Sequence, residues 1–236
     1  MGAEKARSSA IGRVAEDRQK ARRDRLALVA DRVAPLGLAR ERTLPVHGAL
    51  AAQFPGGALQ RGAVVTTSGM GATSLALAVA AGPSSAGSWT AFVGCTDIGL
   101  AAAGELGIVL ERLLVVVPGS TEWLSTVAAL VGAVEVIIVS PHHRIRETDA
   151  RRIAARLRER GSVLVVIGDR WPVTADVRLD VTGSSWNGLG VGHGMLTTRA
   201  VRIAGGGRRA AARPRALDVL LPGTGGAPQS VDRLHR

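Results

Sequence analysis

The chain has 236 residues, which is enough for one α/β domain with flanking extensions and a sizeable buried core. Hydrophobic residues make up 46% of it, which excludes a wholly disordered chain, and aromatic residues make up only 3%, so the core must consist mainly of Val, Leu, Ile and Ala. The formal net charge of +11 lies at the two ends: residues 1–44 carry 11 basic and 6 acidic side chains, residues 45–198 carry 11 of each, and residues 199–236 carry 8 and 2.

Residues 1–44 are expected to form a basic helical extension. Residues 9–34 have the pattern of a polar, arginine-rich helix in which Leu26, Val29 and Val33 make a narrow apolar stripe. The stripe is suited to docking on the domain or on another protein. Basic ends attract the phosphates of nucleic acids or an acidic protein surface, although solvated tails have the same composition. The first residues are charged and contain no apolar run, so we expect no secretory signal.

Short apolar runs then alternate with segments of helical pattern. Strands separated by connections of helix length predict right-handed βαβ units and a mostly parallel central sheet flanked by helices. The nearly continuous apolar character of the runs indicates burial on both faces of that sheet. The expected strands are 63–67, 89–94, 113–117, 136–140 and 163–167, and the expected helices are 72–81, 98–106, 121–131 and 147–160.

The C-terminal part has a different pattern. Residues 176–181 and 195–203 are expected to be antiparallel edge strands around glycine-rich turns. From residue 205 the composition turns to Gly, Pro, Arg and Ala, with one apolar run at 216–221, so 205–236 are expected to be a basic, disordered tail. The core domain would then span 45–204. No membrane span is expected, because the uncharged stretch 62–96 is interrupted by glycines and a proline.

The turn from Thr66 to Ser74 has the position of a phosphate-binding loop, between the first core strand and its helix. Such a loop needs glycines so that backbone N–H groups can wrap phosphate, a lysine for the β/γ charge and a hydroxyl for Mg²⁺. Gly69, Gly71 and Thr73 fit the glycine and hydroxyl positions. Ala72 stands where the lysine belongs, so the turn itself offers no cation to a triphosphate.

The segments around this turn resemble the RecA family, in the family's order. The resemblance covers about residues 44–203 and implies a RecA-like core. The first matching segment is the lead-in 57–62, before the turn. The others are 106–108 with 113–115 and Pro118, then Glu122 with 130–131 and 134–139, and finally 175–181.

This resemblance places the functional positions of the family on residues that cannot perform the same roles. The catalytic glutamate falls at Thr96, the Walker B aspartate at Ser140 and the γ-phosphate sensor glutamine at Asp169. Asp97 is the neighbour of Thr96 and would need a loop shift to act as a base. We therefore expect no catalytic residue, no ATPase activity and no cofactor. Weak binding of ATP and Mg²⁺ through the vestigial turn, at Gly69, Gly71 and Thr73, stays open.

The two loops that bind DNA in RecA would be reduced here to 141–147 and 169–174. Arg144, Arg146, Arg170 and Trp171 remain in them as candidates for contacting phosphate and stacking a base. The alternative is that Trp171 caps the end of the sheet and the arginines are solvated.

Metal and hydrolase chemistry are not indicated. His142 and His143 are adjacent and point to opposite faces of an extended chain, and no ligand spacing links them to Cys95, so no metal site is expected. Ser68 lacks the Gly-x-Ser-x-Gly pattern of a nucleophile elbow. The single cysteine excludes an internal disulfide and fits a reducing cytoplasm.

The pattern of losses, with the arginine-rich end, resembles the short actinobacterial and mycobacterial form of the ImuA-type mutasome accessory proteins. That resemblance implies a scaffold in DNA repair, made in the SOS response to DNA damage and used in translesion synthesis and induced mutagenesis. The implied partners are ImuB, an inactive relative of Y-family polymerases, an error-prone DnaE-type polymerase, and RecA and DNA through the basic termini. The implied location is cytoplasmic, at the nucleoid when recruited to damage. Two alternatives stay open: a recombination regulator that binds nucleotide and single-stranded DNA, and a SulA-like inhibitor of cell division.

Overall fold

The computed structural model describes residues 43–95, 98–119, 121–208 and 211–231, which all belong to one compact unit spanning residues 36–236. The expected helix at 9–34 lies outside the described residues. None of the helices in the described ranges is long and apolar enough to cross a membrane.

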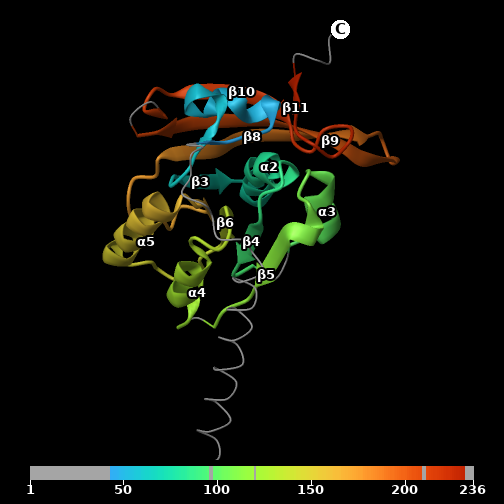
Figure 1. The fold of residues 1–236 in the computed structure, drawn as a ribbon. Helices are drawn as coiled ribbons and strands as arrows, with labels where there is room; N and C mark the ends of the chain where they lie inside the picture. Colours follow the sequence, from blue (N-terminus) through green and yellow to red (C-terminus); the bar gives the residue numbers. More distant parts are fainter. Residues whose placement is uncertain (1–42, 96–97, 120, 209–210, 232–236) are drawn as a thin grey trace, which may run out of the picture. The chain divides into compact units, whose positions relative to one another are not determined.

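A nine-stranded sheet runs through the described part of the chain (Figure 1). Its strands lie in the order β11-β10-β9-β8-β3-β7-β6-β4-β5. The neighbours from β8 to β5 are parallel, and β8, β9, β10 and β11 pair antiparallel. The strands are β3 (Val64–Gly69), β4 (Thr90–Val93), β5 (Leu113–Val116), β6 (Val136–Val139), β7 (Val163–Ile167), β8 (Val177–Leu189), β9 (Gly194–Gly207), β10 (Arg215–Leu220) and β11 (Gln229–Ser230). A separate two-stranded sheet pairs β1 (Thr43–Leu44) with β2 (Leu59–Gln60).

Helices cover both faces of the parallel part, as the sequence predicts. Alternate strand residues point to opposite faces, so one face packs on α2 and α3 and the other on α4 and α5. The expected strands and helices are confirmed, with ends shifted by a few residues. The helices are α2 (Ala72–Ser85), α3 (Leu100–Glu105), α4 (Trp123–Leu130) and α5 (Glu147–Arg160), and the 3-10 turns are η1 (Gly48–Gln53), η2 (Pro55–Gly57) and η3 (Leu110–Arg112).

The two longest helices form for different reasons. Helix α2 has no charged side chain and is buried along most of its length, so its stability comes from packing of Ala, Leu and Val. Helix α5 is amphipathic and has acidic residues in its first turn and arginines in its last, which complements the helix dipole. It ends at Gly161, whose φ of 75° is the left-handed conformation that closes many helices.

The expectation of a disordered tail at 205–236 is wrong for the residues that the structure describes. Strand β9 continues to Gly207, and β10 pairs with it over six residues. Val219, Leu220 and Leu221 are buried, in line with the apolar run at 216–221. The run folds because β9 presents Val201 and Ile203 to a core that η1 also enters, so a further strand completes that layer. The folded core therefore does not end at residue 204.

Strands β8 and β9 extend beyond the rest of the sheet as a two-stranded hairpin, at the right-hand end of the sheet in Figure 1. We call residues 182–198 the hairpin arm. It contains no Asp, Glu, Lys or Arg. Its large apolar side chains are exposed, from 46% for Trp186 to 99% for Val191.

Candidate functional site

The turn between β3 and α2 is shaped by two glycines with left-handed backbone. Gly69 has a φ of 83°, and a Cβ there would overlap the carbonyl oxygen of Val181 on β8. Gly71 caps α2 with a φ of 92°. Only glycine adopts such conformations at little cost, and only glycine leaves room for the neighbouring strand. The Thr67 hydroxyl donates to the Ala72 carbonyl at 3.0 Å and ties the strand to the first turn of the helix.

A guanidinium from β9 lies against this turn. Arg199 is only 6% exposed, and its Nη1 lies where a side chain on Gly71 would be. Its Nη2 donates to the Met70 carbonyl at 2.7 Å and to the Ser184 hydroxyl at 2.9 Å. Its guanidinium carbon lies 5.8 Å from the centre of the Trp186 ring, within cation–π range. The chain therefore fills the space beside Gly71 with one of its own side chains.

The turn itself has no cationic side chain, but Arg199 reaches it from a distant strand. Among the described residues no carboxylate pairs with Arg199, and its Nε is buried without an acceptor. The N-terminus of α2 carries partial positive charge and has no side-chain cap. The guanidinium is thus fixed by neutral oxygens and an aromatic face.

The other face of β3 carries an acidic cluster. Ser68 donates to Asp180 on β8 at 2.6 Å, and Arg178 pairs with the same carboxylate at 2.8 Å. Both strands line a pocket of about 500 Å³, β3 through Thr66 and Ser68, and Asp169 lines it from the loop after β7. Its ionisable lining residues are two aspartates and one arginine, so the potential there opposes a polyphosphate.

Gly69 ends β3, Gly71 caps α2 and Thr73 lies in the first turn of α2. Ser140, at the Walker B position, follows β6 and donates its N–H to the Val93 carbonyl at 3.2 Å. Asp169, at the sensor position, is exposed. Thr96 and Asp97 lie outside the described residues.

The candidate nucleic-acid residues lie after β6 and β7, which are neighbouring strands. Arg144 and Arg146 are exposed. Arg170 is also exposed, and its Nη1 donates to the His142 carbonyl at 2.7 Å, which joins the two loops. Trp171 is only 7% exposed and packs in the core between the sheet and α5, so its ring has no free face for a base.

Sequence reasoning missed Arg199 and Asp180 as parts of the site. A sequence pattern could have revealed Arg199. It lies two residues before Val201 and four before Ile203, both buried, and side chains at this spacing point to the same face of a strand. Asp180 could not be recognised, because its contact with Ser68 joins strands that are far apart in sequence. In the described ranges no three His, Cys, Asp or Glu side chains lie close enough together to hold a metal ion.

Residues 52–173 match the family described as the MT3502 N-terminal domain. The chain belongs to this family. Over 102 residues, 43% of its length, this family member is 35% identical to the uncharacterized protein Rv3395c of Mycobacterium tuberculosis. The match spans 50% of Rv3395c, so the chain covers about half the length of this curated relative.

Solved structures identify the fold of this MT3502 N-terminal domain protein as RecA-like. The crystal structure of the RadB recombinase matches with a TM-score of 0.54 at 15% identity and covers 78% of this chain and 96% of RadB. The flagellar accessory protein FlaH of Methanocaldococcus jannaschii matches with a TM-score of 0.50 at 10% identity, over 76% and 93% of the two chains. At these identities the likeness establishes the architecture alone.

Proposed function

We propose that this protein is a RecA-fold protein that no longer hydrolyses ATP and acts by binding partners. The observation that carries the proposal is the placement of Arg199 against Gly71. In a working phosphate loop the corresponding space faces the ligand, and a lysine supplies the counter-charge. Here the lysine position is Ala72, which is buried, and the nearby guanidinium is held by Met70 and Ser184.

The residues at the other functional positions support the same proposal. Ser140 and Asp169 cannot replace the aspartate that holds Mg²⁺ and the glutamine that senses the γ-phosphate. Loss of a general base costs about 10²–10⁴-fold in rate, and loss of a transition-state charge clamp costs a comparable factor. Both losses act on the same hydrolytic step, so we expect no ATP hydrolysis at the rate of a working RecA-fold ATPase.

The finer proposal is a role in the mutasome, as an ImuA-type accessory protein of error-prone translesion synthesis. It rests on the resemblance to the short ImuA-type form: a RecA-like core, reduced DNA loops and an arginine-rich end. In this role the core would hold an ImuB-type polymerase relative and an error-prone DnaE-type polymerase together after DNA damage.

Nucleotide titration tests the first proposal. A ligand present at 100 times its Kd stabilises a protein by about 2.7 kcal/mol, so millimolar MgATP would visibly raise the Tm if it bound with micromolar affinity. We expect no shift and no phosphate release. Micromolar binding that requires Mg²⁺ and is lost in Thr73→Val would favour the recombination regulator instead.

Partner capture tests the mutasome role. The full chain, tagged and expressed in cells treated with a DNA-damaging agent, is expected to retain the ImuB-type protein. A two-hybrid assay against the division GTPase provides the contrast, because a SulA-like inhibitor would bind that protein. Capture of the GTPase without the ImuB-type protein would overturn this assignment.

A further inference from the structure

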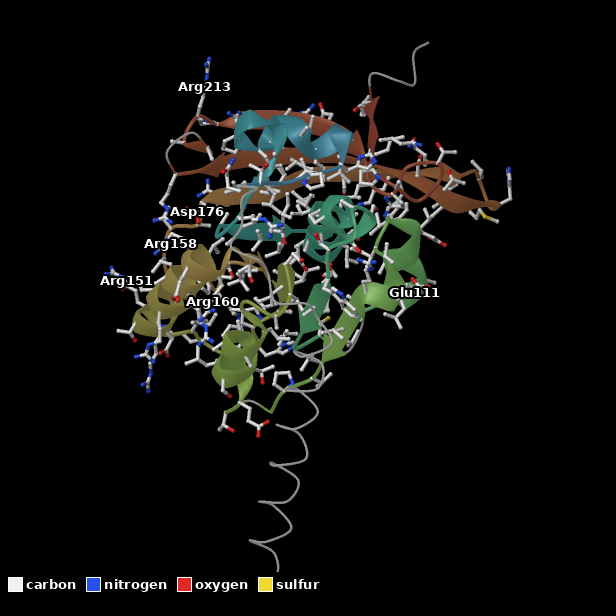
Figure 2. All side chains as sticks on the ribbon, in the orientation of Figure 1. Glu111, Arg151, Arg158, Arg160, Asp176 and Arg213 are labelled. Atoms are coloured by element: carbon white, nitrogen blue, oxygen red, sulfur yellow. The ribbon has the colours of Figure 1, made fainter. Side chains whose placement is uncertain are left out.

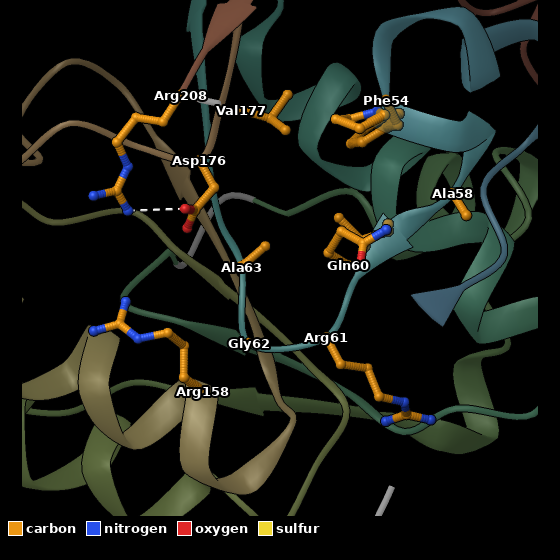
Figure 3. Close-up of a pocket in the computed structure, with 12 residues that line it drawn as sticks. Phe54, Ala58, Gln60, Arg61, Gly62, Ala63, Arg158, Asp176, Val177 and Arg208 are labelled. Carbon is orange, nitrogen blue, oxygen red and sulfur yellow. Dashed lines mark hydrogen bonds and ion pairs between the residues drawn. The ribbon is translucent and has the colours of Figure 1, made fainter. Parts of the chain in front are cut away.

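A pocket of about 370 Å³ lies at the amino end of β3 (Figure 3). The β3–α2 turn lies at the other end of the same strand. One part of its wall is apolar: Pro55 and Ala58 are partly exposed there, whereas Phe54, Leu59 and Val177 are buried. The rest is basic, because Arg61, Arg158 and Arg208 line it. None of these residues belongs to the turn or to the candidate DNA loops. The volume lies in the range of pockets that bind ligands in proteins.

The positive charge of this pocket is only partly balanced. Asp176 accepts from Arg208 Nη2 at 2.8 Å and from the Val64 N–H at 2.9 Å, so both of its oxygens are used. Within the described ranges, neither Arg61 nor Arg158 has a hydrogen bond or an ion pair. Nε and Nη1 of Arg61 are also buried without an acceptor, which is unfavourable for a guanidinium group.

The two unpaired guanidinium groups point away from each other. Figure 3 shows Arg158 reaching from α5 toward the side where Arg208 and Asp176 lie, while Arg61 extends to the other side of Gly62. A single small anion therefore cannot pair with both. An elongated occupant can, if it carries negative charge at two places and an apolar group between them.

The basic surface continues beyond the pocket along α5. A neighbouring hollow of about 380 Å³ shares Arg158 and Arg208 and adds Arg151, which pairs with Glu147. Arg151 and Arg158 project from the same helix on the side of Asp176 (Figure 2). An occupant longer than the pocket would meet further positive charge on this side.

A nucleotide fits these features less well. Phe54 is only 3% exposed and offers no face on which a base can stack. Arg158 lies in the last turn of α5, where the helix dipole is negative, so a doubly charged phosphate is disfavoured more than a carboxylate. Carboxylates pair readily with guanidinium groups in a bidentate arrangement.

We infer that this pocket binds an acidic peptide segment of a partner protein, with an apolar side chain in the pocket and acidic residues on either side of it pairing with Arg61 and Arg158. This inference deepens the proposed scaffold function and rests on it, because it assigns the partner contact to a site and a chemistry. The segment would be recognised by side-chain charge and by burial of its apolar group.

Fluorescence anisotropy on the full chain tests the inference. The probe is a short fluorescein-labelled peptide with leucine and phenylalanine between glutamates. We expect saturable binding that is lost when glutamine replaces the glutamates or alanine replaces the apolar pair. Arg158→Glu should weaken binding by about tenfold or more, and Arg61→Gln should also weaken it. Arg152→Glu is the matched control, because Arg152 is exposed on the same helix and lines neither hollow.

Three results would overturn the inference: no saturable binding, equal weakening by Arg152→Glu and Arg158→Glu, or displacement of the peptide by a single-stranded oligonucleotide whose own binding needs Arg158. The second result would indicate diffuse charge attraction, and the third a nucleic-acid site. Circular dichroism of each variant separates loss of binding from loss of folding. Failure of the proposed function would be seen separately, as MgATP hydrolysis by the unaltered chain.

Discussion

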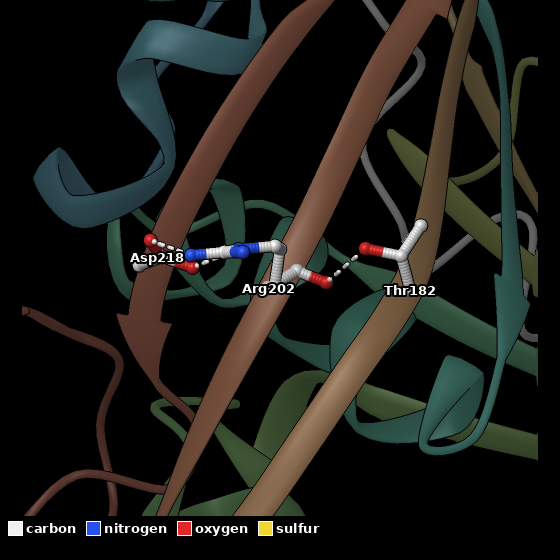
Figure 4. Close-up of polar contacts among 3 residues, drawn as sticks. All are labelled: Thr182, Arg202 and Asp218. Carbon is white, nitrogen blue, oxygen red and sulfur yellow. Dashed lines mark hydrogen bonds and ion pairs between the residues drawn. The ribbon is translucent and has the colours of Figure 1, made fainter.

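At the scale of single residues, Arg202 and Asp218 form a cross-strand pair between β9 and β10 (Figure 4). Arg202 Nε lies 2.8 Å from one carboxylate oxygen of Asp218 and Nη2 lies 3.0 Å from the other. The Thr182 hydroxyl donates to the Arg202 carbonyl from the other side, at 3.4 Å. The hydrogen bonds from Arg202 hold the pKa of Asp218 below its usual value, and those to Asp218 raise the pKa of Arg202.

This pair predicts the direction in which the pKa of Asp218 changes when Arg202 is replaced. A lowered pKa in the folded state means that the stabilising contribution of Asp218 is fully present above the unfolded-state pKa and is lost as the pH falls through the folded-state pKa. In Arg202→Gln, an NMR titration should show the pKa of Asp218 returning upward to the ordinary range. Arg213→Gln is the control, because Arg213 is exposed, and it should leave that pKa unchanged. An unchanged Asp218 pKa in Arg202→Gln would contradict the assignment.

The turn at the end of β3 yields a second prediction, based on two glycines of the same backbone conformation. Gly69 and Gly168 have φ values of 83° and 94°, but a Cβ would overlap the Val181 carbonyl only at Gly69 and would meet nothing within 4 Å at Gly168. Gly168→Ala should therefore lower the free energy of unfolding by about 1–2 kcal/mol, because alanine disfavours the left-handed conformation. Gly69→Ala should cost a further ~1–3 kcal/mol from the overlap. Urea unfolding measures both, and equal losses would show that β8 does not pack against Gly69.

At the scale of elements, β10 belongs to the folded core. Val219 is fully buried on this strand, whereas Ala216 on the same strand is exposed. Val219→Asp should destabilise the protein by about 3 kcal/mol or more, because a carboxylate would be buried without a partner. Ala216→Asp should change stability by less than about 0.5 kcal/mol. Thermal unfolding of the two variants provides the measurement, and similar Tm values would mean that β10 does not pack on the core.

The accuracy of the sequence-based predictions differs among elements for physical reasons. The parallel strands and their helices could be predicted because apolar runs and helical periodicity are local patterns. Strand β10 could not, because its pairing with β9 is long-range and its flanks have the Gly, Pro and Arg content of disordered segments. The candidate site shows the same difference between local and long-range features. Gly69 and Gly71 can be recognised from the sequence, but the contact of Arg199 with Gly71 depends on the path of β9 through the domain.

At the scale of the whole molecule, the positive charge lies mostly outside the region that contains the candidate DNA loops. Residues 45–198 are neutral overall, Arg170 is engaged by His142, and Trp171 is buried. We therefore expect non-specific DNA binding to depend on the chain ends.

The salt dependence of DNA binding measures this expectation. The slope of log K against log salt changes by about 0.9 for each phosphate contact that is lost. Replacing Arg144, Arg146 and Arg170 by alanine should leave the slope nearly unchanged. Replacing Arg18, Arg22, Arg23 and Arg25 by glutamine should lower its magnitude. The reverse pattern would assign DNA contact to the loops after β6 and β7.

Trp186 has a consequence for how this protein can be studied. Trp123 and Trp171 are buried and Trp89 is half-buried, whereas the Trp186 indole is 46% exposed and stands next to the Arg199 guanidinium. Acrylamide dissolved in the buffer would therefore quench its emission first. Any molecule that displaces Arg199 from Gly71 would change the surroundings of this indole. The fluorescence of the unlabelled protein would therefore report binding at the turn.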